Sequence, residues 1–117
     1  MRPTGTNLTG KRESPGRENA TMPLVEQIQL GHGTALGVKV DLPRAPLVMI
    51  RASNGFAMCG YLNMEAVNKM GEVAVRVTGV KTFDDVLNAK VVNVSDKARE
   101  LGITDAMTAR EALEKMF

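Results

Sequence analysis

The sequence predicts an α+β fold: a two-layer α-β sandwich with a predominantly antiparallel or mixed sheet and helices on one face. Three observations support this class. Apolar and polar residues alternate over much of the first half of the chain, as in strands. Residues typical of helix caps are found mainly in the second half. A chain of 117 residues is long enough for one hydrophobic core. Strands that come first and helices that come later are typical of α+β folds.

The first three strands are expected at residues 24–30, 35–42 and 47–52, where apolar side chains recur in the strand pattern. Gly31, His32 and Gly33 separate the first two strands and have the length of a hairpin loop, so these two strands should pair antiparallel. Two prolines end the second strand.

A fourth strand is expected over residues 56–62, after a turn at Asn54 and Gly55. Asn-Gly is the strongest short hairpin signal, because both residues tolerate a positive φ. Both faces of this strand are largely apolar. Such a strand is expected to be central and covered on both sides, or to lie in a subunit interface.

The remaining elements are marked mainly by cap residues. Thr108 and Glu111 form the expected capping box of the last helix, and Thr82 with Asp85 resembles one. The expected elements are a helix at 64–70 capped by Asn63 and closed by Gly71, a strand at 73–77, a helix at 83–88, a strand at 91–94, a helix between Ser95 and Gly102, and a helix from Thr108 through Met116.

The N-terminal 21 residues are expected to form a flexible basic tail before a single domain at residues 22–117. They are rich in Gly, Pro, Thr, Ser and Asn and hold few apolar side chains. Four basic and two acidic residues give the tail a charge of +2, the whole net charge of the chain, and eleven of each sign remain in the body. Met22, where the folding pattern begins, can itself serve as a translation start.

Composition argues against several classes of function. No apolar run approaches the roughly 20 residues that a membrane-spanning helix needs. Basic and acidic side chains are equal in number in residues 22–117, which argues against nucleic-acid binding. One Cys and one His are too few for a usual zinc site, and no cofactor motif is found, so we expect no metal and no cofactor. A single cysteine without an apolar signal segment predicts a cytoplasmic protein.

Cys59 is the candidate catalytic residue, because an activated thiolate is a strong nucleophile. The only histidine, His32, lies in the expected hairpin loop, and nothing in the sequence brings it to Cys59. Free cysteine is also among the most buried residue types, so packing in the core is the favoured interpretation.

Gly60 and Lys81 add signals for a ligand site. A glycine inside a strand often marks a bulge or the close approach of a ligand. Lys81 precedes an expected helix N-terminus, where an anion can bind, although Asp84 and Asp85 already satisfy the helix dipole. The candidate ligand-binding residues are Asn54, Gly55, Met58, Cys59, Gly60 and Lys81.

Three segments carry a resemblance to a known family. NGFAMCGYLN at 54–63, VTGV at 77–80 with FDD at 83–85, and MTAREAL at 107–113 together resemble the YunC-like family, over roughly residues 24–116. The resemblance implies a two-layer α-β sandwich in a prokaryotic cytoplasmic protein. It implies no activity and no role for the Met-Cys-Gly segment.

Two hypotheses of function follow. In the first, this is a self-associating domain, either non-catalytic or binding a small-molecule ligand. The apolar fourth strand and the eight methionines favour a homo-oligomer. In the alternative, it is a thiol-dependent enzyme or redox sensor that uses Cys59.

Overall fold

The computed structural model describes residues 24–117, so the expected N-terminal tail lies outside the described residues. Six strands and four helices make up the described chain. In order they are β1 (Leu24–Gln29), β2 (Thr34–Asp41), β3 (Pro46–Arg51), β4 (Phe56–Met58), α1 (Met64–Met70), β5 (Ala74–Arg76), α2 (Phe83–Asn88), β6 (Asn93–Val94), α3 (Asp96–Glu100) and α4 (Ala109–Glu114).

The six strands form one mixed sheet whose spatial order follows the chain, from β1 to β6. β1 and β2 pair antiparallel across the Gly31–Gly33 loop, as the hairpin signal predicts. The remaining neighbours are also antiparallel except β4 and β5, which are parallel and joined through α1. The predicted mixed sheet is therefore confirmed.

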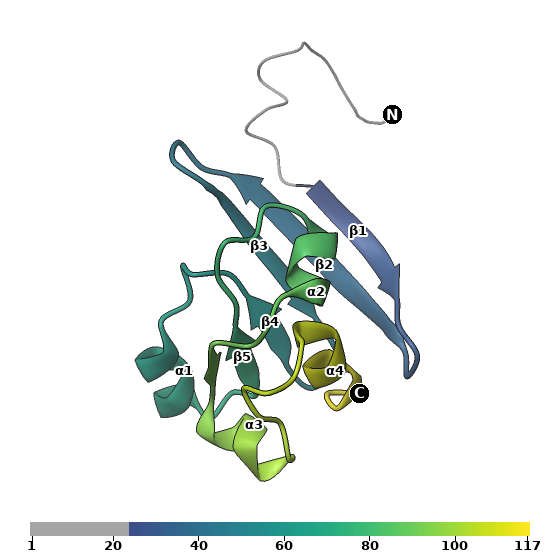
Figure 1. Ribbon diagram of the computed structural model, residues 1–117, viewed down its shortest axis with the longest axis vertical. Coiled ribbons are helices and arrows are strands. Elements are labelled where there is room, and N and C mark those ends of the chain that lie inside the picture. Colours follow the sequence, from purple (N-terminus) through teal and green to yellow (C-terminus); the bar gives the residue numbers. More distant parts are fainter. Residues whose placement is uncertain (1–23) are drawn as a thin grey trace, which may run out of the picture.

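Helices pack against this sheet: α2 contacts β3, α4 contacts β4 and α3 contacts β5. Figure 1 shows α2 and α4 in front of the strands, with α1 at the end of the sheet opposite β1. Side chains that alternate toward the helices are fully buried, including Val48, Ile50, Ala57 and Val75. The α+β class with helices packed on a sheet is confirmed, and the core lies between the two layers.

The other face of the sheet carries apolar side chains that stay partly exposed. Cross-strand pairing places eight of them on this face, because directly paired residues point to the same side; two of the eight, Leu47 and Met58, also pack against the core. None is fully buried, and Val25 is 57% exposed. We call the surface formed by the other six the open face; they are Val25, Leu36, Val38, Val40, Met49 and Phe56.

The predicted helix caps are all present. The side chains of Asn63, Thr82, Ser95 and Thr108 each accept a hydrogen bond from a backbone N–H in the first turn of the following helix. Thr108 completes its capping box with the N3 glutamate. The capping box expected for Thr82 with Asp85 is not formed. The Asp85 carboxylate accepts a hydrogen bond from the N–H of the residue before Thr82, whereas a capping box needs the N–H of Thr82 itself.

The fourth strand is shorter than predicted. It ends at Met58, and the N–H of Leu62 donates to the Cys59 carbonyl over 3.1 Å, which turns the chain. Gly60 therefore lies in a turn, and the prediction of a strand through residue 62 is wrong. Apolar side chains continue past the strand because Cys59 points into the core and Tyr61 lines a pocket.

Within residues 24–117, no helix has the length and apolar character needed to cross a membrane.

Candidate functional site

A pocket of about 340 Å³ lies where three segments meet at one edge of the sheet. β4 and β5 are parallel, so the segments that follow them leave the sheet at the same edge. β3 runs antiparallel to β4, which brings the residues at its start to the same place. The fold thus assembles the pocket from chain segments far apart in sequence.

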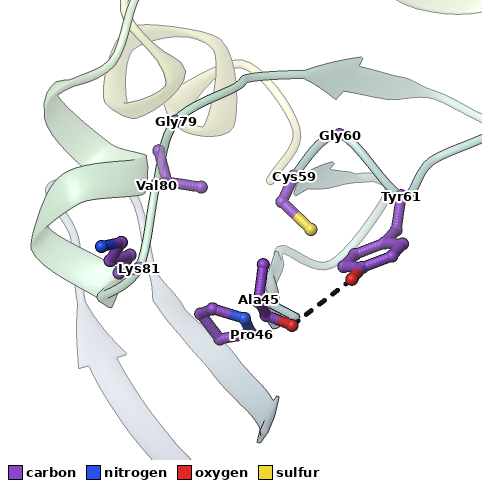
Figure 2. Close-up of a pocket in the computed structure, with 8 residues that line it drawn as sticks. All are labelled: Ala45, Pro46, Cys59, Gly60, Tyr61, Gly79, Val80 and Lys81. Carbon is purple, nitrogen blue, oxygen red and sulfur yellow. Dashed lines mark hydrogen bonds between the residues drawn. The ribbon is translucent and has the colours of Figure 1, made fainter. Parts of the chain in front are cut away.

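The lining is mostly apolar, with a few polar groups around it. Cys59 is buried, and its Sγ accepts a hydrogen bond from the Val48 N–H at 3.4 Å. The Tyr61 hydroxyl donates to the Ala45 carbonyl oxygen, also over 3.4 Å, while Lys81 lies on the opposite side (Figure 2). The lining residues are Ala45, Pro46, Cys59, Gly60, Tyr61, Gly79, Val80 and Lys81.

The structure brings together only part of the predicted site. Cys59, Gly60 and Lys81 line this pocket, although 21 positions separate Gly60 from Lys81 in the sequence. Asn54 and Gly55 lie at the other end of β4, in a separate and more polar pocket that also includes Arg51 and Glu72. Met58 lies in the strand between them.

Sequence reasoning missed the other walls of the pocket. Tyr61, Val80 and Pro46 read as ordinary strand and loop residues. The signal that could have found them was the parallel pairing of β4 and β5, because it predicts that residues 59–61 and 79–81 converge. No local sequence pattern encoded that pairing.

The chemistry around Cys59 favours packing or binding over nucleophilic catalysis. Within the described residues its sulfur hydrogen-bonds only to a backbone N–H, and no base or cation pairs with it. His32 is engaged elsewhere, as Glu114 binds it. The described chain also holds no group of three His, Cys, Asp or Glu side chains placed to bind a metal ion.

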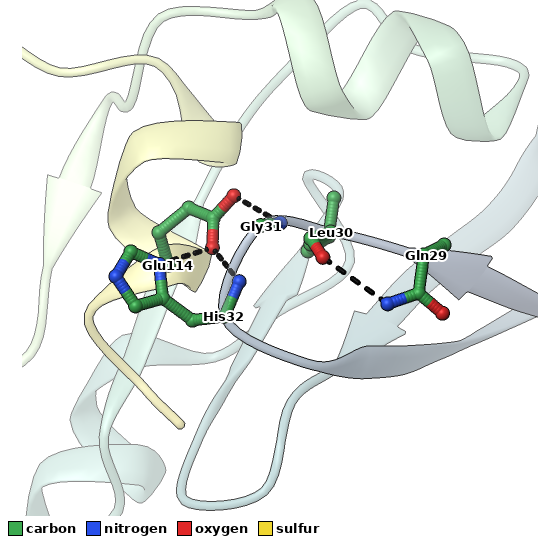
Figure 3. A network of polar contacts seen from close by, with 5 residues as sticks. All are labelled: Gln29, Leu30, Gly31, His32 and Glu114. Atoms are coloured by element: carbon green, nitrogen blue, oxygen red, sulfur yellow. Dashed lines mark hydrogen bonds and ion pairs between the residues drawn. The ribbon is translucent and has the colours of Figure 1, made fainter.

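Glu114 on α4 holds the β1–β2 hairpin through three hydrogen bonds (Figure 3). Its carboxylate accepts from the N–H groups of Gly31 at 2.7 Å and His32 at 2.8 Å, and it contacts His32 Nδ1 at 2.7 Å. The hydrogen bond with the His32 side chain is the largest cause that lowers the pKa of Glu114, and the backbone N–H donors lower it further. This cluster links the C-terminal helix to the first hairpin and is structural.

Replacing Glu114 with Gln is expected to destabilise the protein in a pH-dependent way. A carboxyl group whose pKa is lowered by folding stabilises the native state above its ordinary pKa of 4.5, and that contribution is lost as pH falls through the lowered folded value. The difference in urea midpoint between wild type and Glu114→Gln should therefore be largest near neutral pH and should shrink as the pH falls below 4.5. A difference that is constant from pH 7 to acid would contradict this role. Glu111→Gln, at the exposed cap of the same helix, tests whether the effect belongs to the hairpin contact.

These features define a small α+β domain with a six-stranded mixed sheet and an apolar pocket at the carboxyl ends of its parallel strands. The family model for a domain of unknown function, DUF1805, matches residues 58–116, and the chain belongs to this family.

Two relatives extend the match. The chain is 39% identical over 84 residues to the uncharacterized protein YunC of Bacillus subtilis strain 168, covering 68% of this chain and 83% of that protein. It is also similar to the crystal structure of a protein of unknown function, TA1206, from Thermoplasma acidophilum. That structure has 47% sequence identity and a TM-score of 0.79, with 82% of this chain and 94% of the other covered. The resemblance to the YunC-like family is confirmed, and neither relative carries a described activity.

Proposed function

We propose that this protein is a non-catalytic domain that binds a small, largely apolar molecule in the pocket beside Cys59. The observation that carries the proposal is the pocket itself, with apolar walls and a tyrosine and a lysine at opposite sides. Ligand sites are typically concave and mostly apolar, with a few polar groups that orient the ligand. At about 340 Å³ this pocket lies near the lower limit of such sites, which favours a small ligand.

The pocket is expected to bind the dye 1-anilinonaphthalene-8-sulfonate, an apolar probe with one negative charge. Tyr61→Ala removes a wall and should weaken binding about five- to tenfold, which corresponds to about 1–1.4 kcal/mol of lost contact. Leu101→Ala is the matched control, because the two side chains are similarly exposed, at 49% for Tyr61 and 47% for Leu101. Its dye affinity should stay within about twofold of wild type.

The same experiment separates the pocket from the open face. Leu36→Ala alters the open face and leaves the pocket intact. If Leu36→Ala abolishes dye binding and Tyr61→Ala does not, the dye binds the sheet and the proposal is contradicted. A second readout is the rate at which iodoacetamide alkylates Cys59, because an occupied pocket should protect its sulfur.

We further propose that the domain self-associates as a homo-oligomer through the open face. The six partly exposed side chains of that face are contiguous across four strands, and contiguous exposed apolar surface commonly marks an interaction site. A symmetric dimer needs only one self-complementary patch, so a second copy of the chain is the partner we infer.

Sedimentation velocity over a range of protein concentrations tests this association. Val38→Lys places a charge at the centre of the open face and should shift the equilibrium toward monomer by at least tenfold, since each 1.4 kcal/mol of lost association energy changes the constant tenfold. Leu101→Lys, on an exposed residue away from the sheet, should leave it unchanged. A wild-type protein that remains monomeric at every concentration rejects the proposal.

The thiol-dependent alternative remains a prediction. Cys59 lends it no support, because the thiol is buried and no basic side chain among residues 24–117 hydrogen-bonds to it. An alkylation rate that rises well below the ordinary thiol pKa of about 8.5 would favour it. The unpaired cysteine supports a cytoplasmic setting, which we propose on that ground.

A further inference from the structure

The lining of the Cys59 pocket changes from buried to exposed. Cys59 and Val80 are buried, whereas the side chains of Tyr61 and Lys81 are exposed. The buried pair therefore forms the floor of the pocket, and the exposed pair forms its rim, on opposite sides (Figure 2). A pocket with an apolar floor and a polar rim suits a molecule that has one apolar end and one polar end.

Lys81 is the one charged residue among the described residues that line the pocket. Its ammonium forms no ion pair with a carboxylate of residues 24–117. The flexible stem of a lysine can lie along an apolar wall while the ammonium stays at the solvent edge. The polar end of a molecule bound in this pocket therefore meets a positive charge.

Two acidic residues adjoin the pocket, and both are engaged elsewhere. Asp85 accepts the backbone N–H of Lys81 at 3.1 Å. Asp41, which pairs with Pro46 across β2 and β3, contacts Lys39 Nζ at 4.0 Å. Neither acid lines the pocket. Because α2 is only six residues long and has two aspartates in its first turn, the ammonium, rather than the helix end, supplies the positive charge.

Backbone donors lie next to Lys81 in the same wall. Within residues 24–117, the N–H groups of Gly79 and Val80 donate to no protein acceptor. Backbone N–H groups are strong donors, and one that belongs to a buried residue gains from an acceptor supplied by a ligand. The segment 79–81 thus combines one positive charge with unused donors.

We infer that the ligand of this pocket is a small monocarboxylic acid whose apolar chain lies on the Cys59 and Val80 floor and whose carboxylate pairs with Lys81. The assignment rests on the proposed function, since it names the chemical class of the same ligand. One ammonium balances one negative charge, whereas a phosphate ester carries about 1.5 to 2 at neutral pH. An acid rich in hydroxyl groups fits less well, because those groups would lose their water against an apolar floor.

Sodium octanoate and 1-octanol share an apolar chain and differ in charge, so the pair tests this assignment. Each is titrated into the ¹⁵N-labelled full-length protein at neutral pH and constant ionic strength. The amide resonances of Gly79 and Val80 should shift saturably, and octanoate should bind at least threefold more tightly than octanol. Gly31 is the internal control, because Glu114 already binds its N–H in the first hairpin and its resonance should not shift.

Lys81→Met removes the charge and keeps an unbranched stem. It should reduce octanoate affinity about three- to fivefold, the upper range for an exposed ion pair, and leave octanol affinity within about twofold of wild type. Lys81→Arg keeps the charge and should retain most of the octanoate affinity. Lys69→Met, at an exposed position of α1, changes the net charge equally and should alter neither affinity.

Sodium hexanoate shows whether the chain of the acid is buried. Octanoate should bind about tenfold more tightly than hexanoate, because each additional buried methylene group contributes about fourfold. Equal affinities would place the chain outside the pocket and overturn the inference.

The remaining outcomes separate this inference from the proposed function. If octanol binds as tightly as octanoate, or if Lys81→Met leaves octanoate affinity unchanged, the carboxylate assignment is overturned while the apolar pocket still binds a ligand. If neither probe shifts the resonances of Gly79 and Val80, the pocket takes neither molecule, and both the inference and the proposed function are contradicted.

Discussion

Gly55→Ala should lower the free energy of unfolding by about 2–3 kcal/mol, the upper part of the range of about 1–3 kcal/mol that is typical of overpacking. A Cβ at this position would lie 2.6 Å from the Val73 carbonyl oxygen and 2.7 Å from Met116 Sδ. The Val73 oxygen cannot move away freely, because it accepts the Phe56 N–H at 3.1 Å. Equilibrium urea unfolding, monitored by far-ultraviolet circular dichroism, measures the loss.

Gly60→Ala is the matched control for this prediction. The nearest heavy atoms to a Cβ there are at 3.9 Å, an ordinary contact distance, and the backbone of Gly60 does not have a positive φ. Its cost should be below about 0.5 kcal/mol, as for surface changes that break no specific contact. Equal losses for the two variants would show that the close approach at Gly55 is not what requires glycine.

Ser95→Ala should cost about 2–3 kcal/mol, more than the loss of an ordinary helix cap. The side chain is fully buried, and its Oγ donates to the Glu72 carbonyl at 2.9 Å. The same oxygen accepts from the N–H groups of Ala74 at 3.0 Å and Ala98 at 3.2 Å. Removing one hydroxyl therefore leaves three backbone groups without a partner, where solvent reaches them poorly.

Thr82→Ala provides the comparison for Ser95, again by urea unfolding. Thr82 is an exposed N-cap whose hydroxyl accepts one N–H, that of Asp85, at 3.0 Å. Its removal should cost about 1 kcal/mol. If both variants lose the same stability, the contacts of Ser95 outside its own helix contribute nothing measurable.

Local signals in the sequence predicted most of the secondary structure. Caps at Asn63 and Thr108 were identified because the chemistry of a cap lies within three or four residues of it. The first hairpin followed from apolar alternation on both sides of a short glycine loop. These features depend on near neighbours in the chain, and near neighbours are visible in one sequence.

Features that depend on distant partners were missed or misplaced. The fourth strand was extended to residue 62 because apolar alternation continues there, although the apolar side chains serve the core and a pocket wall. Five of the six candidate ligand residues lie close together in sequence, yet a short strand separates Asn54 from Cys59 and places them in different pockets.

The hydrogen bonds between Glu114 and the first hairpin affect the order in which contacts can form while the chain is being synthesised. The strands lie in the sheet in the same order as in the chain, so each can pair with its predecessor as it leaves the ribosome. The acceptor for the Gly31 and His32 amides, however, is made 82 or 83 residues later. The nascent hairpin must rely on water for those hydrogen bonds until the last helix arrives. The first turn therefore gains these hydrogen bonds only after the C-terminal helix has been synthesised.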